Sequence, residues 1–452
     1  MIIKNGKVAL PGKNEFSEVD IKVKAGKIIE IGYNLSGDMD ILNAKGMFIF
    51  PGGIDPHVHF NDPGYTFNED FYHGSCTAVF GGITTVIDMP CTSIPPVTNK
   101  DNLFEKLKVV KQKAVVDFGF FGGVSSQSYK ESILFNMEGL SEYVLGFKIY
   151  FISVMKTFGR LNHFQFKKVL EKAKKLNLPV LLHAEDYNYV TKATEIFKKE
   201  GNSPIHYYNS RPEKAEILAI TSAVKLAQQV GADLHIVHVG TAKAATLIAK
   251  HIATDETEPH YLEFDIDDFE RIGSSLKTTP PVKSPENKEK LWQLLSKGSI
   301  NFVASDHAPC PEKAKNTGSI WTDYSGIPGC GTLLPYMFSE GYMKGRISLS
   351  RFVKVISENA SKRYGIFDKK GSIEVGKDAD FVLIDAKKNW IVRGQEFYSK
   401  GKITPFEGME FKGKIIKTIL RGKVIYDSDK GILAERGYGK FLKPQYPVKD
   451  TK

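Results

Sequence analysis

Short apolar runs alternate with longer amphipathic stretches between Pro51 and about Ser372, a pattern typical of repeated strand–helix units. Seven of the predicted strands are clear, and an eighth is expected in the weaker stretch near His251–Tyr261. Eight such units close into a barrel, so the sequence predicts an α/β fold with a (β/α)8 barrel of the TIM type. The seven clear strands are Phe48–Ile54, Ile83–Asp88, Val115–Phe121, Tyr143–Tyr150, Pro179–His183, Asp233–Val239 and Ile300–Ser305.

Both ends of the chain instead alternate short strands with glycine turns. The simplest architecture pairs the two ends into one small β-sandwich beside the barrel. The predicted limits are residues 1–50 and 373–452 for the sandwich and 51–372 for the barrel. The expected strands and strand pairs are Ile2–Lys4, Lys7–Leu10, Val19–Lys24, Lys27–Ile31, Met47–Phe50, Ile373–Ile384 and Ile416–Tyr426.

Composition places the chain among ordinary soluble globular proteins. Its 452 residues are 42% hydrophobic and 25% charged, which suits one large domain plus a smaller one. No apolar run approaches the roughly 18 residues that span a bilayer, and no export signal is visible. The cysteines are too sparse for a disulfide framework, so a cytoplasmic location without a membrane partner is expected. They are Cys76, Cys91, Cys310 and Cys330.

The net charge of +10 raises the question of nucleic-acid binding. The lysines, however, are scattered along helical stretches such as Glu105–Lys113 and Glu171–Lys175, beside acidic partners. This arrangement favours solvated helix faces over a binding groove, and no nucleic-acid partner is predicted. A small anionic substrate would still gain mildly from the positive charge.

The strongest local signal for chemistry is the segment Asp55–His59 (DPHVH), directly after the first apolar run. Histidines at i and i+2 on a strand point the same way and can bind one cation. A lone H-x-H is a modest signal, and a single histidine after a strand is more often a core residue. Here the other strands also end in ligand-type residues, and barrel enzymes build their sites from such ends. These residues are Lys148, His183, His238 and Asp306.

Lys148 needs separate treatment because an ammonium group cannot bind a cation and is costly to bury beside one. As a neutral amine it can react with CO₂ to form a carbamate. The two carbamate oxygens can bridge two cations about 3.5–4 Å apart. The alternative is an ordinary lysine whose ammonium reaches solvent from a strand end.

Four segments resemble the amidohydrolase superfamily, and within it the cyclic amidohydrolases allantoinase, dihydroorotase and hydantoinase. The resemblance covers essentially the whole chain. It implies an enzyme that hydrolyses a small cyclic amide or ureide, as a homodimer or homotetramer. The segments are Pro51–Phe60 (PGGIDPHVHF), Gly81–Pro90 (GGITTVIDMP), Ser305–Pro311 (SDHAPCP) and Gly376–Phe381 (GKDADF).

The resemblance also implies a dinuclear metal centre, with zinc as the default ion. One cation would be held by His57, His59 and Asp306, the other by His183 and His238, and carboxylated Lys148 would bridge both. A hydroxide shared by the two cations would attack the ring carbonyl. Asp306 would take its proton and pass it to the departing nitrogen.

Two departures bear on the substrate. Dihydroorotases carry an arginine and an asparagine at the positions of Asn61 and Cys91, where they bind the substrate carboxylate. The segments His59–Gly64 (HFNDPG) and Met89–Pro96 (MPCTSIPP) are instead similar to allantoinases, and so is Thr279 before Pro-Pro. The resemblance therefore favours hydrolysis of allantoin to allantoate in purine catabolism, with Asn61, Cys91 and Thr279 in the substrate site.

Three alternatives stay open. A dihydroorotase could bind its substrate carboxylate through Lys156 or Arg160 of the fourth loop. Hydantoinases place an oxyanion-binding tyrosine where this chain has Ser153, which disfavours that activity unless Tyr150 takes the role. A non-catalytic scaffold relative would be expected to lose ligands, yet all six are present.

Weaker features complete the sequence-based predictions. Asp88 and Glu185 follow strands and could orient a ligand imidazole, although turn carboxylates are as common. Cys91 is expected to line the pocket rather than act as a nucleophile, because no histidine is expected beside it. Asn359–Gly365 resembles the helix that closes the barrel in this family.

Overall fold

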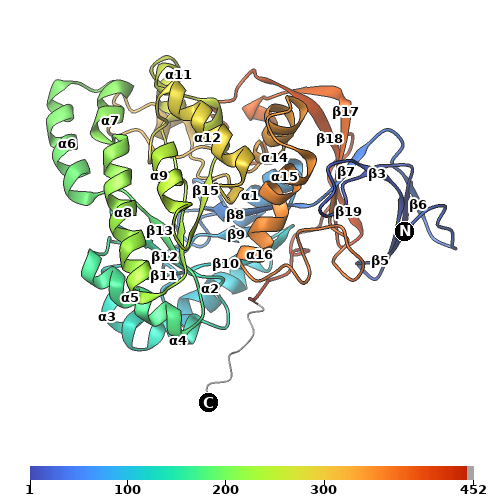
Figure 1. Cartoon of the computed structure of the whole chain (residues 1–452), viewed down its shortest axis with the longest axis horizontal. Helices are drawn as coiled ribbons and strands as arrows, with labels where there is room; N and C mark the ends of the chain where they lie inside the picture. Colours follow the sequence, from blue (N-terminus) through green and yellow to red (C-terminus); the bar gives the residue numbers. More distant parts are fainter. Residues whose placement is uncertain (445–452) are drawn as a thin grey trace.

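The computed structural model describes residues 1–444 and shows a barrel with a smaller two-sheet β-sandwich at its side (Figure 1). The eight barrel strands are all parallel to their neighbours, and the predicted eighth strand is present as β15. The strands are β8 (Gly53–Val58), β9 (Ile83–Asp88), β10 (Asp117–Phe120), β12 (Phe147–Tyr150), β13 (Val180–His183), β14 (Leu234–Ile236), β15 (Ala253–Thr257) and β16 (Phe302–Val303).

Backbone contacts outside the regular strands close the barrel. Val58 forms a parallel bridge with His307, which joins β8 to the segment after β16. Between β10 and β12, Leu145 N donates to Phe120 O at 2.9 Å, while the two-residue strand β11 (Gly122–Gly123) pairs with β12. The carboxyl ends of all eight strands therefore meet at one rim.

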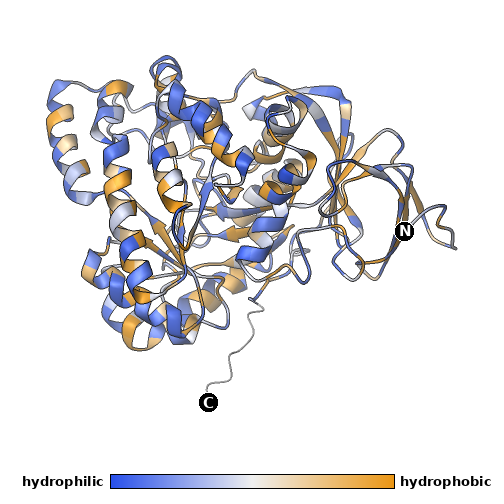
Figure 2. Ribbon diagram, viewed as in Figure 1, coloured by the Kyte–Doolittle hydropathy of each residue, from blue (hydrophilic) through white to orange (hydrophobic). Residues whose placement is uncertain are grey.

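Helices cover the outside of the barrel, and their sequences explain how they begin and end. In α5, Asn162 accepts a hydrogen bond from Gln165 N at 2.9 Å and Gln165 Oε1 accepts one from Asn162 N, a capping box. The buried residues Phe166, Val169 and Ala173 follow the helical period, and lysines complete the last turn. The outer helices thus present both hydrophobic and hydrophilic residues (Figure 2).

The remaining helices lie in the connections between strands and after the barrel. In the described part of the chain, none is long and apolar enough to cross a bilayer. The helices are α1 (Phe71–Phe80), α2 (Lys100–Val110), α3 (Tyr129–Glu131), α4 (Met137–Leu140), α5 (His163–Lys175), α6 (Tyr187–Glu200), α7 (Pro204–Ser210), α8 (Glu213–Val230), α9 (Ala242–Ile248), α10 (Pro259–Glu263), α11 (Ile266–Ile272), α12 (Pro285–Lys297), α13 (Glu312–Lys315), α14 (Leu333–Tyr336), α15 (Leu349–Val353) and α16 (Asn359–Arg363).

The sandwich combines both ends of the chain, as predicted. Its smaller sheet has the order β5-β4-β1-β6, and its larger sheet has the order β20-β19-β18-β17-β7-β2-β3. In the larger sheet, β7 and β17 pair antiparallel, with Phe381 opposite Pro51. The strands are β1 (Ile2–Lys4), β2 (Lys7–Val8), β3 (Ser17–Glu18), β4 (Asp20–Lys24), β5 (Lys27–Gly32), β6 (Ile41–Asn43), β7 (Phe48–Pro51), β17 (Phe381–Ile391), β18 (Glu410–Leu420), β19 (Lys423–Asp427) and β20 (Gly431–Ile432).

One predicted strand is divided between the two parts. The run Phe48–Ile54 was expected to be the first barrel strand, but Phe48–Pro51 belongs to the sandwich and the barrel strand begins at Gly53. The apolar pattern is continuous across the junction because both strands are buried, so it carries no boundary signal. The predicted sandwich limit beyond residue 444 lies outside the described residues.

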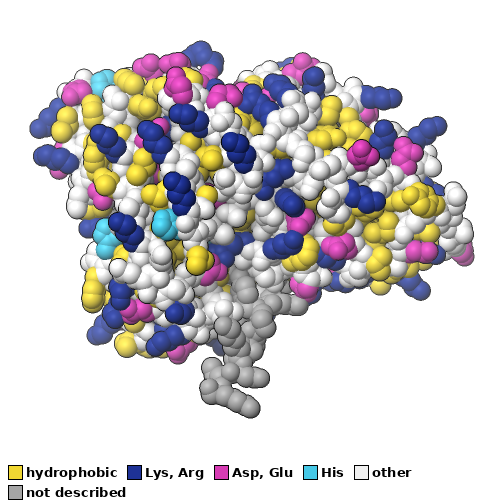
Figure 3. Space-filling model, viewed as in Figure 1, with side chains coloured by type: hydrophobic (Ala, Val, Ile, Leu, Met, Phe, Trp, Pro, Cys, Tyr) yellow, Lys and Arg dark blue, Asp and Glu magenta, His cyan; other side chains and the backbone are white. Residues whose placement is uncertain are grey.

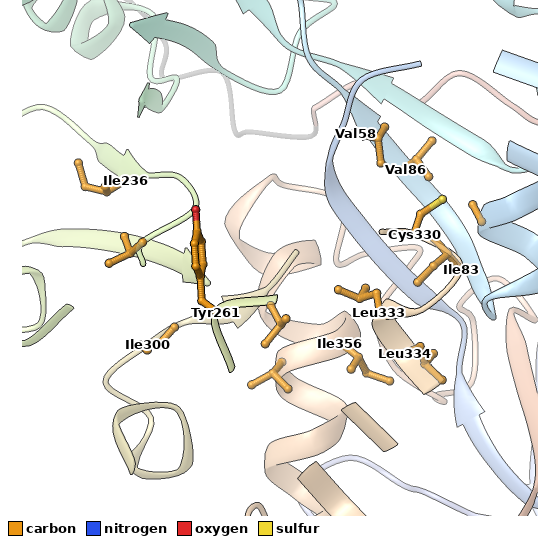
Figure 4. Packing of buried hydrophobic residues seen from close by; sticks show 14 of the residues in the cluster. Val58, Ile83, Val86, Ile236, Tyr261, Ile300, Cys330, Leu333, Leu334 and Ile356 are labelled. Carbon is orange, nitrogen blue, oxygen red and sulfur yellow. The ribbon is translucent and has the colours of Figure 1, made fainter. Parts of the chain in front are cut away.

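Two hydrophobic cores fix the barrel. Inside it, Ile54, Leu181 and Phe302 pack with Tyr364, whose ring centroid lies 5.1 Å from that of Phe121. Ser357 Oγ donates to Gly52 O at 2.8 Å and Asn359 Nδ2 to Asn301 O at 2.7 Å, so the predicted closing helix lies where β8 and β16 begin, opposite the carboxyl rim. A larger core joins strands to helices, and Figure 4 shows Val58, Ile83 and Val86 near Cys330, Leu333 and Leu334.

On the face drawn in Figure 3, lysines and arginines are interspersed with acidic side chains rather than gathered in one patch. All four cysteines are buried free thiols.

Candidate metal centre and active site

The residues predicted at the strand ends come together at the carboxyl rim of the barrel. His57 lies in β8 and His59 directly follows it, Lys148 lies in β12, and His183 ends β13. His238 and Asp306 follow β14 and β16. Of the six, only Asp306 is partly exposed, with 15% of its side chain accessible.

Two groups of side chains face each other across the rim. Asp306 Oδ1 lies 3.2 Å from His57 Nε2 and 3.1 Å from His59 Nε2. On the other side, His183 Nδ1 lies 2.8 Å from His238 Nε2. The rings of His57 and His238 are 5.6 Å apart between centroids, which links the two groups. Nitrogen and oxygen donors that converge in this way are suited to holding cations.

Lys148 lies among these groups as a fully buried amine. Within the described residues, its Nζ has no hydrogen-bond partner, and it lies 5.1 Å from the centre of the Tyr150 ring. Burial lowers the pKa of Lys148 to about 8, against the attraction of nearby acidic groups. The neutral amine is therefore accessible near neutral pH, which is the form that reacts with CO₂.

Two of the imidazoles, those of His57 and His183, contact carboxylates through the ring nitrogen that faces away from the candidate metal centre. His57 Nδ1 contacts the carboxylate of Glu256, and His183 Nε2 lies 3.0 Å from Glu185 Oε2. Arg211 Nη1 in turn donates to Glu185 Oε2 at 2.5 Å. Carboxylates that engage the outer ring nitrogen orient the inner nitrogen toward a metal, a common arrangement at metal sites.

The protonation of these groups follows from their surroundings. Burial and the neighbouring Lys148 hold the pKa of His57 well below its ordinary value, and burial with His183 does the same for His238. For His59, burial opposes the charged ring, but Cys91 and Asp306 raise its pKa to about 10. Burial also opposes the ionised form of Glu185, yet Arg211 and His183 hold its pKa at about 2.

Backbone strain concentrates at the same rim. Asn61, His238 and Asp306 adopt left-handed conformations with φ of 52°, 42° and 47°, which are uncommon for residues other than glycine. Such strain is retained where the surrounding structure fixes it, often at active sites. Its occurrence at three rim positions agrees with a functional role for this region.

The three residues predicted to bind substrate have different surroundings. Asn61 is buried, and its Nδ2 has no partner in the described part of the chain. Cys91 Sγ lies 3.1 Å from the Tyr150 hydroxyl and 3.8 Å from His59 Nδ1. The hydroxyl of Thr279 instead bonds Tyr207 and Ser325, at 2.6 and 2.5 Å. Of the three, Cys91 thus contacts a predicted ligand, His59.

The structure also decides several weaker expectations. The expectation that no histidine faces Cys91 is wrong, because the turn after β9 brings its thiol beside His59. Asp88 accepts a hydrogen bond from Phe60 N at 2.7 Å and forms an ion pair with Lys106 at 2.6 Å. It therefore stabilises the loop after β8 and does not orient a ligand imidazole.

The sequence-based predictions did not include the buried polar residues in β15 and directly after it. Glu256 contacts His57 and lies 3.2 Å from His235 Nε2, while Glu258 and His260 are buried nearby. The segment Ala253–His260 (ATDETEPH) contains three acidic residues and resembles a solvent-exposed turn. One signal in the sequence could have identified them. Glu256 and Glu258 are two residues apart in the stretch expected to form the eighth strand, so their side chains should lie on the same face of that strand.

Comparison with known proteins places the chain in a family. Residues 48–425 match the amidohydrolase family. An allantoinase of Rubrobacter xylanophilus is 35% identical over 459 residues, covering 98% of each chain. An allantoinase of Escherichia coli K12 is 35% identical over 446 residues, covering 95% of this chain and 96% of its own.

Solved structures give the same result. L-Hydantoinase from Arthrobacter aurescens matches with a TM-score of 0.92 at 32% identity, covering 98% of this chain and 99% of its own. Dihydropyrimidinase from Brevibacillus agri matches with a TM-score of 0.88 at 29% identity over the same shares. The chain therefore belongs to the amidohydrolase family and is a cyclic amidohydrolase.

Proposed function

We propose that the substrate is allantoin, whose five-membered ureide ring the enzyme opens to allantoate. The observation that carries this proposal is the neutral polar character of the rim beside the candidate metal centre. Asn61 offers a buried amide nitrogen without a partner among the described residues, and the thiol of Cys91 lies 3.1 Å from the hydroxyl of Tyr150. A neutral ureide needs such hydrogen-bonding groups rather than a charged clamp.

Lys156 and Arg160 are the cations expected from the sequence to bind a substrate carboxylate. Lys156 is exposed, and the guanidinium of Arg160 lies 3.6 Å from the centre of the Tyr187 ring. Arg211 is paired with Glu185. These contacts favour allantoin over dihydroorotate, because a carboxylate bound without charge-assisted partners forfeits roughly 1.5–3 kcal/mol for each missing bond. The 35% identity to allantoinases over nearly the whole chain supports the same choice.

The six rim side chains fit a pair of divalent cations, which we propose to be zinc. His57, His59 and Asp306 would hold one, His183 and His238 the other, and carboxylated Lys148 would bridge both. The convergent nitrogens, the unpartnered amine and the outer carboxylates support this set. When bound, the cations supply Lewis acidity toward the ring carbonyl and lower the pKa of water.

The protein side chains then have separate roles. The carboxylate of Asp306, partly exposed at the rim, takes a proton from the attacking water and returns it to the departing ring nitrogen. Tyr150 offers a hydroxyl toward the developing oxyanion, whereas the hydroxyl of Ser153 donates to Phe158 O at 2.7 Å. Water is excluded from the barrel interior by the packed residues beneath the rim.

Several fold relatives are named as hydantoinases, so hydantoin is the second candidate substrate. The test is ring opening by metal-loaded, bicarbonate-treated protein with allantoin, dihydroorotate and hydantoin at equal concentrations. We expect kcat/KM for allantoin to exceed the others at least about a hundredfold, which corresponds to about 2.7 kcal/mol of transition-state discrimination. Preferential turnover of dihydroorotate would contradict the argument from Asn61 and Cys91.

We also propose a homodimer or homotetramer. Apolar side chains are exposed by more than half on neighbouring parts of the surface, at Leu134 and Phe135 before α4 and at Phe164 in α5. Such exposure is unusual unless a partner covers it. Light scattering during size-exclusion chromatography measures the assembly directly, and a monomeric mass at micromolar concentration would contradict it.

A further inference from the structure

The loop after β14 holds His238 in a backbone conformation that depends on contacts with the rest of the chain. Its φ of 42° is left-handed, which is unfavourable for a residue other than glycine. Such a conformation persists only where surrounding contacts fix it. The contacts of the next residues, Val239–Ala242, therefore decide whether the imidazole of His238 stays in place.

Two buried side chains from neighbouring helices bind this loop. Gly240 N donates to Glu216 Oε1 at 3.0 Å, and the Thr241 hydroxyl donates to Glu216 Oε2 at 2.5 Å. Asn287 Nδ2 donates to Gly240 O at 2.8 Å, and Ala242 N donates to Asn287 Oδ1 at 2.7 Å. Glu216 lies in α8 and Asn287 in α12, and α9 lies between these helices (Figure 1). The loop is therefore held from both sides of α9.

The beginning of α8 also holds the loop that carries the other histidine of the same group. Asp186 N donates to Ala215 O at 3.0 Å, in the first turn of the helix. Arg211, shortly before the helix, pairs with the carboxylate that contacts His183. One end of α8 thus supports both His183 and His238, whose rings lie 4.6 Å apart between centroids.

Among the described residues, both hydrogen bonds that Glu216 accepts come from the loop after His238. Its side chain is buried, and burial raises its pKa to about 7, although Lys283, Thr241 and Gly240 lower it. The bonds to the loop do not require the ionised form. In the neutral acid, Oε1 still accepts from Gly240 N and Oε2 donates to the Thr241 hydroxyl. The cost of burying this carboxyl group is therefore offset at the loop in either form.

We propose that Glu216 is a positioning residue for His238, acting through the backbone of the loop and not by contact with a cation or the substrate. Asn287 completes this support from α12. The inference rests on the metal centre proposed above, in which His183 and His238 hold one of the two cations, but not on the identity of the substrate. Loss of Glu216 should therefore weaken the binding of this cation more than that of the other.

The test uses the full-length protein, freed of metal and titrated with Co²⁺ in bicarbonate, without substrate. Competition with a chelator measures the affinity for each ion, and His238→Ala identifies the ion that His238 holds. Glu216→Ala should lower the affinity for that ion about tenfold or more and leave the other within about threefold of the wild type. Glu216→Gln should recover most of the loss, because its amide oxygen still accepts from Gly240 N.

Asp20→Ala is the matched control. Asp20 is buried in β4 of the sandwich, and its carboxylate accepts from Leu35 N at 3.0 Å. It therefore supports a loop by the same kind of bond in another part of the molecule. Its loss should leave both Co²⁺ affinities unchanged.

Thr241→Val covers the case in which Glu216→Ala does not fold. It removes one bond to Glu216 at nearly constant side-chain volume and should lower the affinity for the same ion at least about threefold. Unchanged affinity in the folded variant, or equal losses for both ions, would overturn the proposal. A wild-type protein that binds fewer than two Co²⁺ ions would instead refute the metal centre, and the inference with it. Because no allantoin is added, a failure of the substrate assignment leaves these results unaffected.

Discussion

The pair formed by Glu185 and Arg211 gives a sharp test of how the structure orients His183. Arg211 is 8% exposed and Glu185 is 1% exposed, and the guanidinium donates to the same carboxylate oxygen that faces His183. Arg211→Met removes the guanidinium and leaves the carboxylate buried beside a single imidazole. Breaking a buried ion pair from one side costs about 3–5 kcal/mol. We expect a loss of that size in the unfolding free energy of the metal-free protein.

The control is the double variant Glu185→Gln with Arg211→Met, which removes both charges. It should lose less stability than Arg211→Met alone, because no unpaired charge remains in the interior. In the double variant His183 also loses its orienting carboxylate, so metal affinity should fall about 10- to 100-fold in that variant. Urea unfolding followed by circular dichroism measures the first quantity, and chelator competition measures the second.

The pH dependence of stability provides an independent check. The pKa of Glu185 is lowered from 4.5 to about 2 in the folded protein. A lowered carboxyl pKa contributes stability that is fully present above pH 4.5 and is lost as the pH falls toward 2. This contribution should be smaller in Arg211→Met, where only His183 and Lys283 still lower the pKa of Glu185. A loss below about 1 kcal/mol at neutral pH, or an unchanged acid profile, would refute the argument.

Three further predictions concern the centre and its support. Lys148→Ala should lose most bound metal, measured by elemental analysis, while circular dichroism stays unchanged; full metal retention would contradict a bridging role. Asp306→Asn should reduce kcat by about 10²-fold or more for any ring that is opened, because it removes the proton acceptor; wild-type turnover would exclude it as the shuttle. Phe121→Ala should destabilise the protein by about 3–5 kcal/mol in urea, since Phe121 fills the barrel interior; a loss under 1 kcal/mol would contradict that packing.

Much of this architecture is already present in the sequence. The strands β9 and β13 follow from their apolar runs, and the strand ends carry the residues that the structure brings to one rim. This works because strand periodicity is a local property, and parallel strands of a barrel end at the same side. The sandwich was predicted for the same reason, from alternating strands at both ends of the chain.

Other features depended on contacts between distant segments. The thiol of Cys91 lies beside His59 only because two loops meet, and Arg211, between α7 and α8, reaches back to Glu185 before α6. Glu256 and Glu258 resemble surface residues when the sequence is considered alone. Burying a charged side chain is favourable only where other parts of the chain supply its partners. The sequence by itself therefore determined the strands and the ligand-type residues at their ends, whereas only the tertiary structure decided which carboxylates are buried and what they contact.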